Sequence, residues 1–186
     1  KFSNITNIMT RVKILDKEFE TSISEATILE SINEVAKRVN HDLKDENPLM
    51  LCVLNGAFMF AADLMKAVTI PCQISFVKVA SYNGTSSTGS VKQLIGLNED
   101  IKGRSIVLVE DIIDTGVTIK GLKEQVVAMG AKDVRVATLL FKPESCMSGI
   151  KPEYIGLTIP NDFIVGYGLD YDGYGRNLRD IYTLVK

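Results

Sequence analysis

The residues with the clearest chemical pattern lie in a short segment between an apolar run and a helical stretch. Residues 106–109 read as a buried strand, and the adjacent acids Glu110 and Asp111 follow it directly. Residues 114–118 then supply a carboxylate, two hydroxyls and a glycine. In open α/β sheets, ligands bind beyond the carboxyl ends of the strands, where a helix N-terminus presents free backbone N–H groups. We therefore expect residues 114–118 to form a cup for a phosphate group.

The carboxylates of Glu110, Asp111 and Asp114 would by themselves repel a phosphate, and burying unpartnered negative charge is costly. The combination makes physical sense if these acids face sugar hydroxyls, a divalent cation or a proton in transit. A single Asp-Thr-Gly before a helix is usually an N-cap. Capping does not account for the two adjacent acids, so we interpret the segment as a binding site.

Residues 109–118, with the sequence VEDIIDTGVT, resemble the phosphoribosyl pyrophosphate signature of type I phosphoribosyltransferases, specifically of their hypoxanthine–guanine branch. The resemblance implies that Glu110 and Asp111 hold the ribose hydroxyls. It implies that Asp114 is the general base near N7 of the purine. The residues implied to bind the 5′-phosphate are Asp114, Thr115, Gly116, Val117 and Thr118. Some relatives carry Lys in place of Val117, which puts the phosphate affinity in question but leaves the backbone amides.

A second segment, residues 54–57, follows the apolar run at residues 49–54 and resembles the family's pyrophosphate loop. The resemblance implies that Asn55 and Gly56 offer backbone N–H groups to pyrophosphate. A non-proline cis bond between Leu54 and Asn55 would be part of this arrangement. The family often has Lys at the position of Asn55, and taken alone an Asn-Gly pair after a strand indicates only a turn.

A polar loop follows the next apolar run. Residues 81–90 consist of Ser, Thr, Gly, Asn and one Tyr, with no charge and nothing to bury, which is typical of a mobile loop. Ser81 and Tyr82 resemble the start of the family's lid. The resemblance implies that closure of this lid excludes water from the reaction.

The C-terminal third resembles the base-binding part of the family. Lys142 matches the lysine that contacts the exocyclic oxygen of the purine, although an isolated Lys after a strand is normally a surface charge. Residues 163–171 resemble the base-binding segment, which includes Asp170. Phe163 matches the aromatic residue that stacks on the purine face, and Ile164 matches the residue whose backbone reads the edge of the base. The implied second substrate is a 6-oxopurine.

Two further charged residues match positions that act on the pyrophosphate. Arg176 corresponds to an arginine that contacts pyrophosphate, for which bidentate donors are well suited. Asp170 corresponds to a residue that helps to hold a second magnesium ion through water. The resemblance thus implies Mg²⁺ as the cofactor, and the residues implied to face it are Glu110, Asp111 and Asp170.

The elements that must position these residues alternate along the chain. Helical periodicity extends over residues 24–39, and short apolar runs typical of buried strands occur at residues 49–54, 74–79, 106–109 and 134–141. The alternation predicts the α/β class, with a mostly parallel sheet flanked by helices, which is also the type I phosphoribosyltransferase fold. We expect a single domain over residues 1–186, with a core at about 24–141. A small hood lobe would form from about 1–23 and 142–186.

Composition excludes several classes of protein. The 186 residues carry a formal net charge of −2, so no broad basic surface is available for a nucleic-acid backbone. No apolar stretch approaches the roughly 18 residues that a membrane span needs, and the polar start lacks the apolar region of a signal peptide. Cys52, Cys72 and Cys146 are better explained as thiols in a reducing compartment than as a disulfide framework. We expect a cytoplasmic protein without a nucleic-acid or membrane partner.

The activity implied by the resemblance is purine salvage. The 5-phosphoribosyl group of phosphoribosyl pyrophosphate would pass to N9 of hypoxanthine or guanine, giving IMP or GMP and pyrophosphate, in a homodimer or homotetramer. One alternative is a regulator that senses phosphoribosyl pyrophosphate without catalysis, although such proteins usually add a DNA-binding module or a basic face. An orotate enzyme tends to have a Lys- or Arg-bearing lid, and adenine enzymes lack the Lys142-to-Asp170 arrangement. The use of xanthine stays open.

Overall fold

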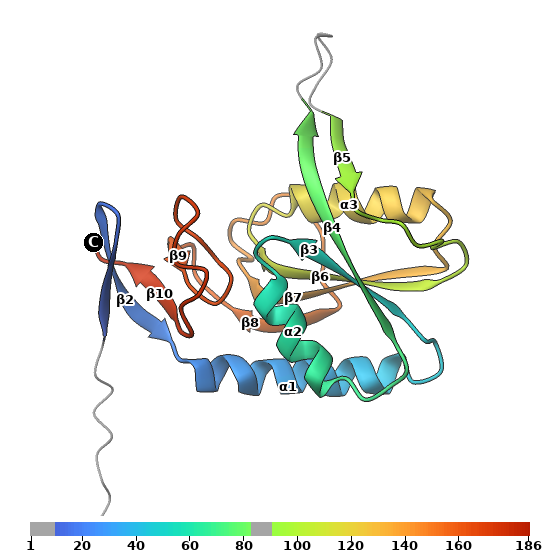
Figure 1. Ribbon diagram of the computed structural model, residues 1–186, viewed down its shortest axis with the longest axis horizontal. Coiled ribbons are helices and arrows are strands. Elements are labelled where there is room, and N and C mark those ends of the chain that lie inside the picture. Colours follow the sequence, from blue (N-terminus) through green and yellow to red (C-terminus); the bar gives the residue numbers. More distant parts are fainter. Residues whose placement is uncertain (1–9, 83–90) are drawn as a thin grey trace, which may run out of the picture.

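The computed structural model of the protein describes residues 10–82 and 91–186 (Figure 1). Its larger sheet has the strand order β5-β4-β3-β6-β7-β8, in which β4, β3, β6, β7 and β8 run parallel and β5 pairs antiparallel with β4. The strands of this sheet are β3 (Leu49–Leu54), β4 (Gln73–Tyr82), β5 (Val91–Ile95), β6 (Ser105–Ile113), β7 (Asp133–Phe141) and β8 (Tyr154–Thr158). The α/β class with a mostly parallel sheet is confirmed.

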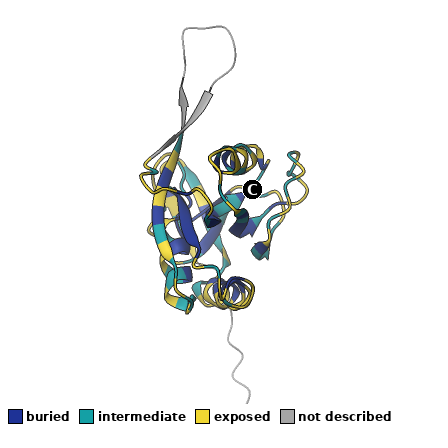
Figure 2. Ribbon diagram, turned by 90° about the vertical axis from the view of Figure 1, so that its right-hand side faces the viewer, coloured by how far each residue is buried: buried dark blue, intermediate teal, exposed yellow. Residues whose placement is uncertain are grey.

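Helices cover both faces of this sheet. Helices α1 (Glu25–Asp42) and α2 (Phe58–Ala67) pack on each other and on one face, and α3 (Val117–Ala128) covers the other face (Figure 1). Parallel strands are buried on both faces, so they consist of nearly continuous apolar residues; β3 has five buried positions in succession. Figure 2 shows the burial of these strands between the helices.

Helix α1 begins where the sequence predicts a helix start. The side chain of Ser24 accepts a hydrogen bond from the backbone N–H of Thr27, as an N-cap does. The buried positions recur at the helical period, at Ile28, Ile32, Val35, Ala36 and Val39. None of the helices in the described part of the chain is long and apolar enough to cross a membrane.

A second, antiparallel sheet forms a hood beside the core (Figure 1). Its strands are β1 (Arg11–Ile14), β2 (Lys17–Ile23), β9 (Ile164–Val165) and β10 (Ile181–Leu184), in the order β1-β2-β10-β9. The hood has a small hydrophobic cluster of its own, formed by Ile14, Phe19, Val165 and Tyr182. It is tied to the core by Asp180, whose Oδ1 accepts a hydrogen bond from the backbone N–H of Glu25 at 2.7 Å.

Two boundaries differ from the sequence-based expectation. Residues 154–158 were expected in the hood, but they form β8, which pairs with β7 at the edge of the core sheet. Their short apolar run marks a strand without indicating which sheet it joins. Strand β4 continues to Tyr82 because it pairs with β5, so Ser81 and Tyr82 end a strand and do not open a loop. Most of the expected lid, residues 83–90, lies outside the described residues.

The fold predicts a large effect of shortening Leu108, a fully buried side chain of β6. We expect Leu108→Ala to lower the free energy of unfolding by about 2–5 kcal/mol, because the lost contacts leave a cavity in a close-packed core. Urea unfolding followed by circular dichroism measures this loss. The control is Leu29→Ala on α1, where Leu29 is 37% exposed and the expected change is below about 1 kcal/mol. Equal losses would contradict this packing.

Candidate functional site

The carboxyl ends of the central parallel strands meet at one edge of the core sheet, and the expected site residues of the core lie there. Strand β3 leads into residues 55–57 before α2, and β6 leads into residues 114–116 before α3. Strand β7 ends one residue before Lys142. Parallel strands with helical crossovers bring these three connections together, as is usual for ligand sites in such sheets.

The expected phosphate cup is a small concave pocket at the start of α3. It has a volume of about 130 Å³, and its lining residues include Glu110, Asp114, Thr115, Gly116 and Thr118. Gly116 is the N-cap residue, with φ 76°, and it brings no side-chain acceptor to the first turn of the helix. An anion can therefore act as the capping acceptor and also interact favourably with the helix dipole.

Gly116 is required at this point for two physical reasons. Its φ of 76° lies in the left-handed region, and a Cβ atom there would overlap with Oγ of Ser148. The loop with Ser148 packs behind the cup, where the backbone N–H groups of Met147 and Ser148 both donate to the carbonyl oxygen of Thr115 at 3.1 Å. The sequence carried no signal for this support, because Ser148 lies in a loop without a matching motif.

The acidic pair at the end of β6 consists of a buried Glu110 and a half-buried Asp111. Glu110 is 9% exposed, its Oε1 accepts a hydrogen bond from the backbone N–H of Asp111 at 3.2 Å, and Asp111 Oδ1 accepts one from Ile112 at 2.9 Å. Burial, and then the neighbouring charge of Asp111, raise the pKa of Glu110 well above its ordinary value. Burial also raises the pKa of Asp111, although hydrogen bonds and the positive charge of Arg176 oppose this shift. The pair thus favours partners that donate hydrogen bonds or carry positive charge.

A divalent cation fits this pair as part of a shared coordination shell. Within residues 10–82 and 91–186, no three acidic, His or Cys side chains gather as a metal-binding group. Mg²⁺ is typically held by one or two carboxylates together with substrate oxygens and waters. Glu110 and Asp111 supply such carboxylates, whereas Asp170 is engaged elsewhere: its Oδ1 lies 2.8 Å from Nη2 of Arg176, and its Oδ2 accepts from the backbone N–H of Gly173 at 2.7 Å.

The loop after β3 lies directly against the acidic pair. The Leu54–Asn55 peptide bond is cis. A Cβ atom on Gly56 would overlap with the carboxylate of Asp111, and one on Gly168 would overlap with the carbonyl oxygen of Gly56. The expected pyrophosphate loop therefore lies between the acids of β6 and a turn of the hood, and Gly168 is a site residue that the family motif did not single out.

The expected general base and the expected purine-contacting lysine form an ion pair. Nζ of Lys142 lies 3.2 Å from Oδ2 of Asp114, with the Lys142 side chain buried and the Asp114 side chain 48% exposed. The backbone N–H of Lys142 donates to the carbonyl oxygen of Ile113 at 3.0 Å, which fixes the start of its loop against β6. The exposed side of Asp114 leaves room for a ligand beside the pair.

The hood carries the aromatic surface. Phe163 is 46% exposed, and its ring packs against Phe19 and, edge to face, against Tyr171, with centroid distances of 6.0 and 5.8 Å. These contacts hold the ring while half of its surface stays open for stacking on a flat heterocycle. Ile164 is buried in β9, so its side chain is a core residue and its backbone is what a ligand could contact.

Arg176 is held beside Asp170 and beside the turn of the hood at Gly168, called the hood turn below. Besides its ion pair with Asp170, Arg176 donates from Nη1 to the carbonyl oxygen of Gly168 at 2.7 Å.

Val117, which stands where some relatives have Lys, is 55% exposed at the first position of α3. The side chains of Ser81 and Tyr82 lie outside the described part of the structure.

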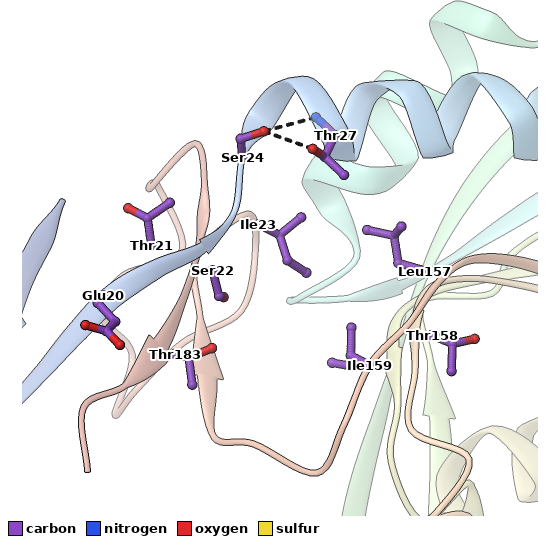
Figure 3. Close-up of a pocket in the computed structure, with 10 residues that line it drawn as sticks. All are labelled: Glu20, Thr21, Ser22, Ile23, Ser24, Thr27, Leu157, Thr158, Ile159 and Thr183. Carbon is purple, nitrogen blue, oxygen red and sulfur yellow. Dashed lines mark hydrogen bonds between the residues drawn. The ribbon is translucent and has the colours of Figure 1, made fainter. Parts of the chain in front are cut away.

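A larger hollow lies elsewhere, between hood strands β2 and β10, the start of α1 and the end of β8 (Figure 3). Its volume is about 660 Å³, and its lining is mostly neutral hydroxyl and aliphatic side chains, with Glu20 as its charged member. A polyphosphate needs positive charge or free N–H groups. The cup at α3 has the groups for such a ligand, whereas the charged side chain that lines the larger hollow, Glu20, would repel it.

The chain is similar to known proteins over most of its length. The family model of the phosphoribosyl transferase domain matches residues 22–172. The hypoxanthine-guanine phosphoribosyltransferase of Lactococcus lactis subsp. lactis (strain IL1403) is 45% identical over 174 residues, covering 92% of this chain and 94% of the relative. The enzyme of that name from Mycobacterium tuberculosis (strain CDC 1551 / Oshkosh) is 40% identical over 160 residues, covering 82% and 79%.

Solved structures are similar over most of the chain. A crystal structure of a hypoxanthine-guanine phosphoribosyltransferase from Bacillus anthracis has a TM-score of 0.79 at 36% identity, covering 89% of this chain and 96% of that one. A mutant hypoxanthine phosphoribosyltransferase from Trypanosoma cruzi, solved as a ternary substrates complex, has a TM-score of 0.82 at 35% identity, covering 89% and 94%. The chain therefore belongs to the phosphoribosyltransferase family, and within it to the group of the hypoxanthine–guanine phosphoribosyltransferases.

Proposed function

We propose that this protein transfers the 5-phosphoribosyl group of phosphoribosyl pyrophosphate to N9 of hypoxanthine or guanine, forming IMP or GMP and pyrophosphate in purine salvage. The observation that carries the proposal is the Asp114–Lys142 ion pair beside the phosphate cup, because it offers an acceptor for a proton and a donor for an oxygen at one point. Relatives that match most of the chain are named as enzymes of this kind. The alternative of a regulator without catalysis gains no support from them.

Phosphoribosyl pyrophosphate binds along the edge of the core sheet. Its 5′-phosphate occupies the cup of residues 114–118, and its ribose hydroxyls donate to Glu110 and Asp111. The pyrophosphate lies between the loop of Asn55 and Gly56 and the guanidinium of Arg176. This assignment is supported by the close approach of Gly56 to Asp111 and by the charge of Arg176, which acts on the same acid.

The purine lies between the hood and the end of β6. Phe163 stacks on its face, the backbone of Ile164 contacts its edge, and Lys142 donates to the 6-oxo group. An adenine carries an amino group at that position, which cannot accept from a lysine ammonium. Selection against adenine follows, because the buried lysine would lose an acceptor.

The reaction exchanges one bond for another at the anomeric carbon. The lone pair of N9 forms the new bond to C1′ while the C1′–O bond to pyrophosphate breaks and its electron pair leaves with pyrophosphate. The ribose develops oxocarbenium character, which the nearby carboxylates of Glu110 and Asp111 stabilise. Asp114 accepts the proton from N7 of the base, and its ion pair with Lys142 orients the carboxylate for that transfer.

Mg²⁺ is the proposed cofactor. Glu110 and Asp111 would face it, and Asp170, which is paired with Arg176, would help to hold a second ion through water. The metal would supply positive charge to balance that of the departing pyrophosphate. The buried acidic pair supports a cation at this end of β6. Ser81 and Tyr82, the last residues of β4, are proposed to lead into a lid that excludes water. The protein is proposed to work in the cytoplasm as a homodimer or homotetramer, without a nucleic-acid or membrane partner.

The function is tested by incubating the protein with phosphoribosyl pyrophosphate, Mg²⁺ and either hypoxanthine, guanine, xanthine or adenine. We expect nucleotide formation from hypoxanthine or guanine and none from adenine, measured by chromatography of the products. Binding of phosphoribosyl pyrophosphate without turnover of any base would instead favour the regulator.

Asp114→Asn tests the general base. We expect kcat to fall by roughly 10²- to 10⁴-fold, because the amide cannot take up the proton. The circular dichroism spectrum and the Kd for phosphoribosyl pyrophosphate should stay close to those of the wild type. The matched control is Asp133→Asn, which changes a carboxylate paired with Arg135 at the opposite end of β7. Near-normal turnover of the Asp114 variant would remove that residue from the role.

The raised pKa of Glu110 predicts a pH-dependent effect on stability. The folded state holds its proton more tightly than the unfolded chain, so the stability of the wild type falls as the pH rises through the raised pKa. In the presence of a chelator, Glu110→Gln should therefore raise Tm at pH 8, and the gain should shrink towards pH 5. Thermal unfolding across this range measures the effect.

The control for this experiment is Glu30→Gln, which changes an exposed carboxylate on α1 and should give no comparable gain. A Tm of Glu110→Gln below that of the wild type at pH 8 would contradict the prediction that the charge of Glu110 destabilises the folded protein. The same variant should bind phosphoribosyl pyrophosphate more weakly, because it loses a charged acceptor for a ribose hydroxyl.

A further inference from the structure

A hydrogen bond between the hood and helix α2 lies outside the set of residues assigned to substrates. The hydroxyl of Tyr167 donates to Oδ2 of Asp63, across 104 positions of sequence. Tyr167 is 2% exposed and has φ 48°, in the left-handed region. A bulky residue in this conformation needs strong support from its surroundings, and the bond to Asp63 provides part of it.

The Tyr167 end of this bond is connected to the residues proposed to bind pyrophosphate, Gly56 and Arg176. The next residue, Gly168, lies against the carbonyl oxygen of Gly56 so closely that a Cβ atom would overlap with it. Gly168 also exchanges two hydrogen bonds with Arg176: its N–H donates to the Arg176 carbonyl oxygen at 2.9 Å, and its own carbonyl oxygen accepts from Nη1 at 2.7 Å. A shift of Tyr167 therefore displaces Arg176.

The Asp63 end of the bond is connected to the pyrophosphate loop through helix α2. Asp63 lies on α2, whose first turn follows the pyrophosphate loop without a break. The backbone N–H of Phe58 donates to the carbonyl oxygen of Asn55 at 3.4 Å, and that of Ala61 donates to Ala57 at 2.8 Å. The helix thus holds Asp63 at a set position relative to the loop.

The bond is strengthened by charge. Burial raises the pKa of Asp63, but the hydrogen bonds from Lys66 and Tyr167 outweigh it, so the net shift is downward. Burial and then Asp63 raise the pKa of Tyr167. At neutral pH a neutral phenol therefore donates to an ionised carboxylate, which is a stronger arrangement than a bond between two neutral groups.

We propose that Asp63 and Tyr167 are a positioning pair that sets the distance between the hood turn and the pyrophosphate loop, so that Arg176 and the loop amides can bind one pyrophosphate together. This inference rests on the proposed function. Neither side chain touches the substrate. Asp114, Lys142 and Phe163 are held by contacts that do not involve the pair, so the pair acts on the binding of phosphoribosyl pyrophosphate and not on the proton transfer.

The variant Tyr167→Phe removes the hydroxyl and keeps the ring. We expect the Kd and KM for phosphoribosyl pyrophosphate to rise by about 5- to 20-fold, which is less than the full loss of a hydrogen bond to a charged group, because the bond lies within the protein and not to the ligand. At saturating phosphoribosyl pyrophosphate, kcat and the KM for hypoxanthine should stay within about twofold, because the base site is untouched. Kd is measured by calorimetry, which does not depend on turnover.

Variants of the partner separate positioning from folding. Asp63→Asn keeps an oxygen that accepts from Tyr167 and should stay within about threefold of the wild-type Kd, whereas Asp63→Ala should resemble Tyr167→Phe. The double variant Tyr167→Phe/Asp63→Ala should bind no more weakly than Asp63→Ala alone, since both changes remove the Tyr167–Asp63 bond and Asp63→Ala also removes the ion pair with Lys66. If Tyr167→Phe does not fold, Asp63→Ala tests the same bond.

The matched control is Tyr154→Phe. Tyr154 is also a buried tyrosine whose hydroxyl contacts an aspartate, donating to Asp42 at 3.2 Å, and it lies on β8 away from the site. It should lose stability without a change in the Kd for phosphoribosyl pyrophosphate. An unchanged Kd in Tyr167→Phe, or an equal rise in Tyr154→Phe, would overturn the positioning role. A wild type that binds phosphoribosyl pyrophosphate but converts no base would overturn the proposed function and still leave the pair tested by Kd.

Discussion

Negative charge buried at the carboxyl end of β6 is the constraint on which the arrangement of the site depends. Glu110 is buried and Asp111 is half-buried at the end of a central strand of the parallel sheet, and burial raises the pKa of both. Such a pair is unfavourable in the free protein. The surrounding groups lower this cost only in part, through backbone N–H donors and the charge of Arg176. A sugar with donor hydroxyls and a cation would offset the rest of the cost of burying this negative charge.

Close backbone approach is the second condition for the site. Gly56 lies against Asp111, and Gly168 lies against Gly56, so three segments from distant parts of the chain meet with no side chain between them. At each of these positions any other residue would separate the segments. The glycines thus let the acids of β6, the loop after β3 and the hood turn act on a single extended ligand, while the Asp114–Lys142 pair serves the base beside it.

Much of this arrangement could be predicted from the chain itself. The strand and helix alternation gave the parallel sheet, and the acids at the end of a buried strand, followed by Asp114 and Gly116, indicated the cup. Other features depend on long-range contacts without a local pattern. Nothing in residues 154–158 tells whether they pair with β7 or with the hood, and the Tyr167–Asp63 bond joins residues 104 positions apart. Strand β4 extends through polar Ser81 because β5 supplies its hydrogen bonds.

The hood brings together strands from opposite parts of the chain, and this has a consequence for synthesis. Strand β2 pairs with β10, so the hood sheet cannot form until Ile181–Leu184 has been synthesised. During translation the parallel core can assemble first, since chains fold from the N-terminal side as they emerge. A nascent chain then holds the phosphate cup before it has a surface for the base. The complete site arises only once Ile181–Leu184 has emerged from the ribosome, so the surface for the base forms after the cup for the phosphate.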